Sequence, residues 1–140
     1  MNPRAAIVTG LIAVLGIAGC KADNSSARPS IDDAVRSRDV ARVRTFTAAD
    51  RVKALESAAQ HGDVEGVKTL LAAGADAQSG MHTAAFMGRT EIVKLLLQRG
   101  ADPNRVMFAS GKTPTQVARE HKHFDVVEIL NEATKNRPLR

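Results

Sequence analysis

The chain lacks tryptophan and tyrosine altogether and has only four phenylalanines among its 140 residues. Any hydrophobic core must therefore be built from alanine, valine, isoleucine and leucine, which favours helices that pack closely on small side chains. A single cysteine excludes an internal disulfide bond. The excess of basic side chains is small, with a formal charge of +5, and the two signs are interspersed, so we expect no nucleic-acid partner.

Motifs for catalysis are missing as well, since the sequence has neither a glycine-rich phosphate loop nor a nucleophile elbow. His121 and His123 could chelate a metal from a turn, but only Glu120 and Asp125 stand beside them and no cysteine completes a site. We therefore expect no enzymatic activity, no metal, no cofactor and no small-molecule substrate. A metal-binding protein or enzyme that uses these two histidines is the least favoured alternative.

The N-terminal segment contains the one long apolar run. It extends from Ala5 to Gly19 behind the basic Arg4 and ends in small residues, which is the arrangement of a secretory signal peptide. The run has 15 residues, fewer than the roughly 20 that a membrane-spanning helix requires. We therefore expect export across a membrane and not a permanent span.

The apolar run closes with the tetrapeptide IAGC at residues 17–20. A branched aliphatic residue and two small residues before a cysteine resemble the lipobox of bacterial lipoproteins, and the alternative is an uncleaved signal anchor. The resemblance implies that residues 1–19 are a signal peptide and that Cys20 is lipidated, which would anchor the protein to a membrane, facing the periplasm. Lys21 replaces the aspartate that marks inner-membrane retention, which favours the outer membrane.

Residues 20–29 carry no large apolar side chain after the cysteine, so we expect a flexible tether there. The folded domain is predicted to span 30–134, followed by a C-terminal tail at 135–140. Four arginines near the anchored end predict a solvated helix face, with contact to anionic lipid head groups as the alternative. They are Arg36, Arg38, Arg42 and Arg44.

The folded part repeats itself. The segment AAQHGD at 58–63 recurs 26 residues later as AAFMGR at 84–89, and an aliphatic ladder and a closing Gly-Ala-Asp follow both copies. A further copy lies at an offset of 34, where VVEIL at 126–130 matches IVKLL at 92–96, and a degenerate one occupies 31–46. Short helix, glycine turn and second helix in fixed order predict stacked helix pairs.

These residues resemble the ankyrin repeat, with the best match from Ser79 to Asn104. The resemblance covers nearly all of 31–134 and implies an all-α solenoid of about four helix pairs with one residual β-hairpin finger. We place the repeats at about 30–50, 51–78, 79–104 and 105–134. The expected structural positions are turn and cap glycines, a helix start and a histidine that ties one loop to its neighbour. They are Gly62, Gly74, Gly88, Gly100, Thr113, Pro114 and His82.

The repeats depart from the family pattern at two positions. Ser79-Gly80 stands where Thr-Pro is usual, and Lys122 replaces the turn glycine. Both changes are expected to weaken local capping.

A single finger is expected, from Ala101 to Lys112, because the offsets of 24 and 26 are short of a full unit of about 33 residues. Its tip is apolar where polar residues are usual. An exposed apolar tip is a candidate anchor for a partner, although it could instead fold back over the stack. The candidate partner-binding residues are Arg105, Val106, Met107 and Phe108.

The expected function is the binding of another protein, as a scaffold or adaptor held at a membrane by its lipid. An immunity or inhibitor protein that neutralises an effector delivered to the periplasm is the alternative. The sequence does not distinguish the two.

Overall fold

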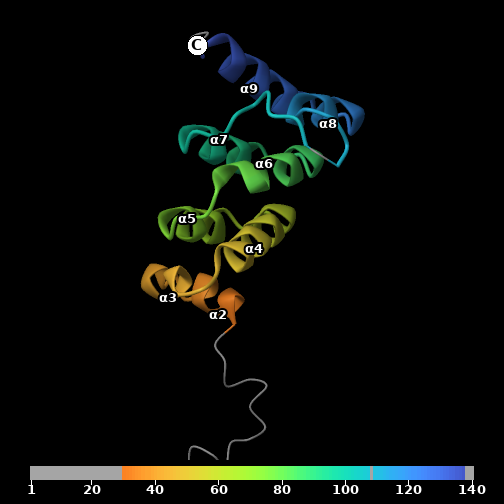
Figure 1. Cartoon of the computed structure of the whole chain (residues 1–140). Coiled ribbons are helices and arrows are strands. Elements are labelled where there is room, and N and C mark those ends of the chain that lie inside the picture. The colour runs from red at the N-terminus through yellow and green to blue at the C-terminus, as the bar shows by residue number, and fades with distance from the viewer. Residues whose placement is uncertain (1–29, 108, 138–140) are drawn as a thin grey trace, which may run out of the picture. The chain divides into compact units, whose positions relative to one another are not determined.

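The computed structural model describes residues 30–107 and 109–137, and Ile31–Arg140 form one compact unit. In the described part there are eight helices and no β-strand, arranged as four successive pairs (Figure 1). The pairs are α2 (Ile31–Arg36) with α3 (Val40–Arg44), α4 (Ala48–His61) with α5 (Val64–Ala72), α6 (Ala77–Phe86) with α7 (Thr90–Gln98), and α8 (Pro114–Glu120) with α9 (Phe124–Lys135). The predicted all-helical repeat is confirmed.

The helices form two layers. The first helices of successive pairs lie side by side, α4 against α6 and α6 against α8, while the second helices α3, α5, α7 and α9 follow one another in the same order. In the described part of the chain, the extensive contacts between helices lie within one pair or between successive pairs, so stability comes from stacking. No helix in the described residues is long and apolar enough to cross a lipid bilayer.

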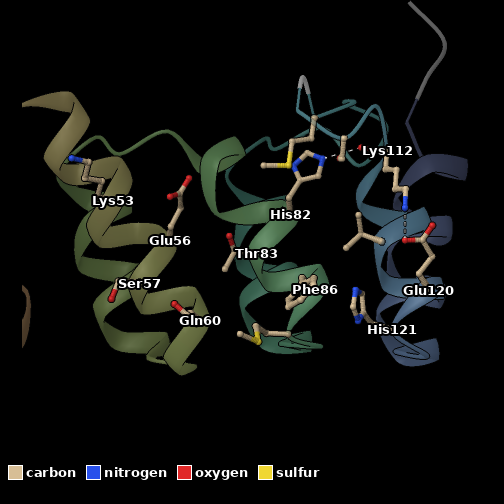
Figure 2. Close-up of a pocket in the computed structure, with 14 residues that line it drawn as sticks. Lys53, Glu56, Ser57, Gln60, His82, Thr83, Phe86, Lys112, Glu120 and His121 are labelled. Atoms are coloured by element: carbon tan, nitrogen blue, oxygen red, sulfur yellow. Dashed lines mark hydrogen bonds and ion pairs between the residues drawn. The ribbon is translucent and has the colours of Figure 1, made fainter.

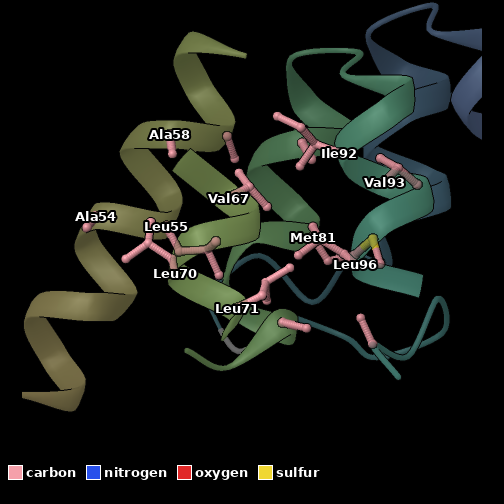
Figure 3. Packing of buried hydrophobic residues seen from close by; sticks show 14 of the residues in the cluster. Ala54, Leu55, Ala58, Val67, Leu70, Leu71, Met81, Ile92, Val93 and Leu96 are labelled. Atoms are coloured by element: carbon pink, nitrogen blue, oxygen red, sulfur yellow. The ribbon is translucent and has the colours of Figure 1, made fainter. Parts of the chain in front are cut away.

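The core between the layers consists of small and aliphatic side chains (Figure 3). Ala59, Ala84 and Ala85 are fully buried and allow the inner helices to approach closely. Leu70 and Leu96 are also fully buried and fill the space between the layers. The near absence of aromatic residues is therefore matched by a core of alanine and branched aliphatic side chains.

The helices begin where the sequence supplies a side-chain cap. Thr47, Asp63 and Thr113 each accept a hydrogen bond from a backbone N–H in the first turn of α4, α5 and α8. Helix α6 begins at Ala77, before Ser79-Gly80, because Asp76 accepts from the Gln78 N–H at 3.0 Å. An aspartate therefore caps α6 in place of the missing Thr-Pro.

Side chains of one repeat also form hydrogen bonds with the C-terminal end of the inner helix in the preceding repeat. The Arg89 guanidinium donates to the Gln60 carbonyl oxygen at 3.1 Å, and His123 Nε2 donates to the Phe86 carbonyl oxygen at 3.0 Å. Arg89 and His123 occupy the same repeat position, as do Gln60 and Phe86. The orphan carbonyls at the helix C-termini are thus satisfied by the next repeat.

The predicted β-hairpin finger is wrong, because no described residue between α7 and α8 is in a strand. Among its described residues the loop has one backbone cross-connection, from the Met107 N–H to the Lys112 carbonyl oxygen at 3.0 Å. The Met107 carbonyl accepts instead from the turn amides of Ser110 and Gly111, and Pro103 has no N–H to donate. A strand ladder therefore cannot extend along the loop.

Several predicted features lie outside the described residues. They are the signal peptide at 1–19, the lipidated Cys20, the tether at 20–29 and the finger residue Phe108.

Candidate functional site

A groove of about 640 Å³ runs across the inner helices α4, α6 and α8 and the loop before α8 (Figure 2). These elements lie together because each inner helix packs against the inner helix of the preceding repeat. Fourteen side chains line the groove: Lys53, Glu56, Ser57, Gln60, His82, Thr83, Phe86, Met87, Met107, Ser110, Lys112, Val117, Glu120 and His121.

Helical periodicity explains why these side chains share one surface. On α4 the groove residues run from Lys53 to Gln60 at spacings of three, four and seven, which is one face of a helix. The opposite face of α4 buries Leu55 and Ala59. On α4, small and aliphatic residues therefore point toward the core and polar residues toward the groove.

The floor of the groove is apolar. Phe86 is 46% exposed and Met107 is 44% exposed, so both leave large apolar surface in water. The Phe86 ring lies against the His121 ring, with centroids 4.1 Å apart and planes tilted by 58°. The exposed part of the Phe86 ring remains available to a ligand.

The charges on the groove walls are balanced. The Lys112 ammonium and the Glu120 carboxylate form an ion pair at 2.7 Å along the α8 side. Lys53 and Glu56 lie on the α4 side and form no ion pair with another described residue. The four charges sum to zero, so the groove has no field of a single sign to attract a charged ligand.

His82 joins the floor to the loop. Its Nε2 lies 3.3 Å from the Lys112 carbonyl oxygen. Burial lowers the pKa of His82 from its ordinary value, against the opposing effect of hydrogen bonds to the carbonyls of Lys112 and Arg105. Burial therefore favours the neutral form of the ring that links α6 to the loop.

The family model for ankyrin repeats matches the chain in three copies over residues 55–138. The chain belongs to the ankyrin-repeat family. Such repeats generally mediate protein–protein interaction. The match begins within α4, and the structure adds α2 and α3 as a further pair packed on the ankyrin stack. A search of curated proteins found no match to the chain.

The structure places three of the four candidate partner-binding residues on the ankyrin surface. Met107 lies in the groove, which agrees with neither a freely projecting tip nor a fully packed one. Val106 is 48% exposed, and together with Arg105 it lines a smaller hollow of about 220 Å³ that shares Glu56 and His82 with the groove. Phe108 lies outside the described residues, so the tip is described only in part.

The predicted structural positions occupy turns and helix ends. Thr113 caps α8 and Pro114 is its first residue, with a reciprocal hydrogen-bond pair between Thr113 and Gln116. The four predicted glycines, Gly62, Gly74, Gly88 and Gly100, all have positive φ, between 67° and 89°.

The histidine pair does not form a metal site with further ligands. The rings of His121 and His123 are 6.5 Å apart between centroids, and His123 Nε2 is engaged by the Phe86 carbonyl. In the described part of the chain, no group of three or more His, Cys, Asp or Glu side chains could hold a metal ion. Both rings are accounted for by packing between repeats.

The α4 wall and Phe86 were not predicted from the sequence. One pattern pointed to Phe86: the equivalent positions of the neighbouring repeats carry the polar Gln60 and Glu120. An aromatic residue at an otherwise polar repeat position marks an exposed apolar group. No sequence pattern distinguishes the α4 residues Lys53 and Glu56 from other charged surface residues. They become groove residues because the folded chain places the loop opposite them.

Proposed function

We propose that this ankyrin-repeat chain is a scaffold or adaptor that binds another protein in the groove along α4, α6 and α8. The exposed apolar floor formed by Phe86 and Met107 carries the proposal, because such side chains gain most when a partner removes them from water. The fully buried side chains of these helices, such as Leu55 and Met81, are needed for stacking and do not line the groove.

We also propose that the chain works by binding, without catalysis. The histidine in the groove floor donates its Nε2 proton to the Lys112 carbonyl, so that nitrogen is not free to take a proton from a nucleophile. The second groove histidine, His121, packs on the Phe86 ring. Neither arrangement is that of a general base beside a nucleophile.

Site-specific photocrosslinking in cells tests the binding proposal. A benzophenone amino acid replaces Gln60 on the groove wall or, as a matched control, Lys94 on the exposed face of α7. The expected result is one crosslinked protein from position 60 that is absent from position 94. Identical products from both positions, or none from position 60, would contradict a partner in the groove.

The proposed location is the cell envelope, with Cys20 lipidated and the ankyrin stack facing the periplasm, at the outer membrane. The apolar run and the tetrapeptide at 17–20 support this proposal. Labelling with a clickable fatty acid, followed by membrane fractionation, tests it on wild type and Cys20→Ser. We expect label on wild type in the outer-membrane fraction and none on the variant. Absence of label from both proteins would contradict the lipoprotein proposal without affecting the proposal that the groove binds a partner.

A further inference from the structure

We propose that the groove holds an extended, uncharged segment of the partner protein, anchored by one large aliphatic or aromatic side chain between Phe86 and Met107. The inference rests on the proposed function and names the chemistry of the partner. Three properties of the groove carry it: the apolar floor, the balanced charges and the free hydrogen-bonding groups on its walls.

The anchor position follows from where the apolar surface gathers. Four large apolar side chains of the described residues are substantially exposed, and two of them, Phe86 and Met107, face this groove, with Val106 beside it. Met87 and Val117 complete the apolar lining. A methionine adapts its shape to different neighbours, so the site accepts either an aliphatic or an aromatic group.

The charges favour an uncharged segment. The Lys112–Glu120 ion pair at 2.7 Å satisfies both of its members, so a charged partner side chain there would compete with an existing partner. On the other wall Lys53 and Glu56 are three residues apart on α4 and offset each other. An acidic or basic segment would meet one like charge for each opposite one.

The polar walls favour an extended backbone. In the described part of the chain, the side chains of Ser57, Gln60 and Thr83 form no hydrogen bond with another protein group, and all three line the groove. An extended peptide carries N–H and C=O groups that need partners once they leave water, whereas a helix satisfies its own. Free hydroxyl and amide groups along α4 and α6 provide such partners.

The size of the groove favours a segment over a folded domain. Its volume of about 640 Å³ is within the range of pockets that enclose a small ligand, roughly 300 to 1,000 Å³. Such a volume accommodates a few side chains. A short stretch of chain therefore fills it.

The test uses the full chain with ¹³C-labelled methionine methyl groups. Met87 and Met107 report on the groove, while Met81 is fully buried in the core and serves as an internal reference. The probes are nine-residue peptides of Gly, Ser and Thr that differ only in the central residue: Leu, Phe, Ala, Glu or Lys. Binding is read as saturable shifts of the methyl resonances.

We expect the Leu and Phe peptides to shift the Met87 and Met107 methyl resonances and leave that of Met81 unchanged. The Ala, Glu and Lys peptides should bind about tenfold or more weakly, because they lack the anchor's apolar area. Phe86→Ala should abolish the shifts, and Phe124→Ala, which removes a side chain 66% exposed at the start of α9 and outside the groove, should keep them. The unchanged Met81 resonance checks that both variants are folded.

Four outcomes would overturn the inference. They are no shift with any peptide, equal binding of the Glu or Lys peptides, groove shifts that depend on the concentration of the chain alone, and groove shifts caused by phosphatidylethanolamine–phosphatidylglycerol vesicles. The third would indicate a second copy as the occupant, and the fourth a lipid. A crosslinked partner from position 60 together with any of these results would leave the proposed function standing and reject the extended segment alone.

Discussion

At the residue scale, the turn glycines of the central repeats are required by their neighbours as well as by their backbone angles. A Cβ on Gly88 would lie 2.5 Å from His123 Nδ1, and one on Gly62 would lie 3.1 Å from the Arg89 guanidinium carbon. These are the same side chains that bind the preceding inner helix. A Cβ at either turn would therefore have to displace a side chain of the next repeat, by more at Gly88 than at Gly62.

Two further turns of this kind carry a side chain in the left-handed region, Arg38 at φ 56° and Lys122 at φ 61°. Asp63 stands at the repeat position of Arg89, the side chain that crosses the Gly62 turn. Its side chain is short, however, and accepts a hydrogen bond from the Gly66 N–H of its own helix. No further helix pair follows Lys122 in the described chain. Glycine is thus needed where a long side chain of the next repeat crosses the turn, which explains the departure at Lys122.

This contrast predicts different costs for two glycine substitutions. Gly88→Ala and Gly74→Ala both place a Cβ at positive φ, which costs about 1 to 2 kcal/mol, but only Gly88 has atoms in the way. We expect Gly88→Ala to lower the free energy of unfolding by about 1 kcal/mol more than Gly74→Ala in urea denaturation. His123→Ala in the same chain should remove most of the difference. Equal losses would show that His123 does not constrain the turn.

The lowered pKa of His82 predicts that stability falls on acidification. Burial lowers its pKa below the ordinary value of 6.5, so the unfolded chain binds the proton more tightly than the folded one. The contribution of His82 is complete above about pH 6.5 and is lost as the pH falls through the folded pKa. NMR titration of His82 should give a midpoint below 6.5, and His82→Gln should flatten the pH dependence of unfolding between these values. A midpoint at or above 6.5 would contradict the burial of the ring.

At the element scale, the second helix of each pair is positioned by a few fully buried aliphatic residues and by ties at its ends. On α7, Leu96 is fully buried between the layers whereas Leu95 is only partly buried. Gln78 at the start of α6 forms reciprocal hydrogen bonds with the backbone of Asp102, at 3.2 Å and 2.7 Å. These bonds hold the base of the loop that carries Met107 to the groove.

The difference between adjacent leucines gives a prediction for α7. Leu96→Ala should lower the free energy of unfolding by about 2 to 5 kcal/mol, because the cavity opens inside the stack where neighbouring repeats cannot collapse. Leu95→Ala, the matched control one residue away, should cost less than half as much. Chemical denaturation followed by circular dichroism measures both, and similar losses would show that the different burial of Leu95 and Leu96 does not set their contributions to stability.

At the scale of the whole molecule, the described stack ends in polar residues. Leu55 and Met81 are fully buried at equivalent positions of α4 and α6, and Thr115 takes that position in α8. Likewise Ala85 is fully buried, and its equivalent in α8 is the exposed Arg119. Polar residues at the end of a solenoid keep it soluble and discourage further stacking.

Restoring apolar residues at this end should therefore promote association. The double variant Thr115→Leu, Arg119→Ala is expected to self-associate at lower concentration than wild type, because it exposes a face that resembles the buried surface of the inner repeats. Sedimentation velocity over a concentration series measures the change. Single substitutions at the exposed Lys94 of α7 serve as the surface control. Unchanged sedimentation of the double variant would show that these two residues do not cap the stack.

The periodic spacing of alanines, glycines and aliphatic residues was enough to predict the helix pairs and their order, because each repeat contacts only its neighbours and local pattern controls stacking. The lipid anchor at Cys20 stays a prediction. The groove depended on contacts that no local pattern encodes, since Glu56, Phe86 and Met107 come from three elements that meet only when the repeats stack. The strandless loop has a local and a tertiary cause: the Met107 carbonyl is bonded within its own turn, and Gln78 and His82 of α6 hold the loop at its base and near its end.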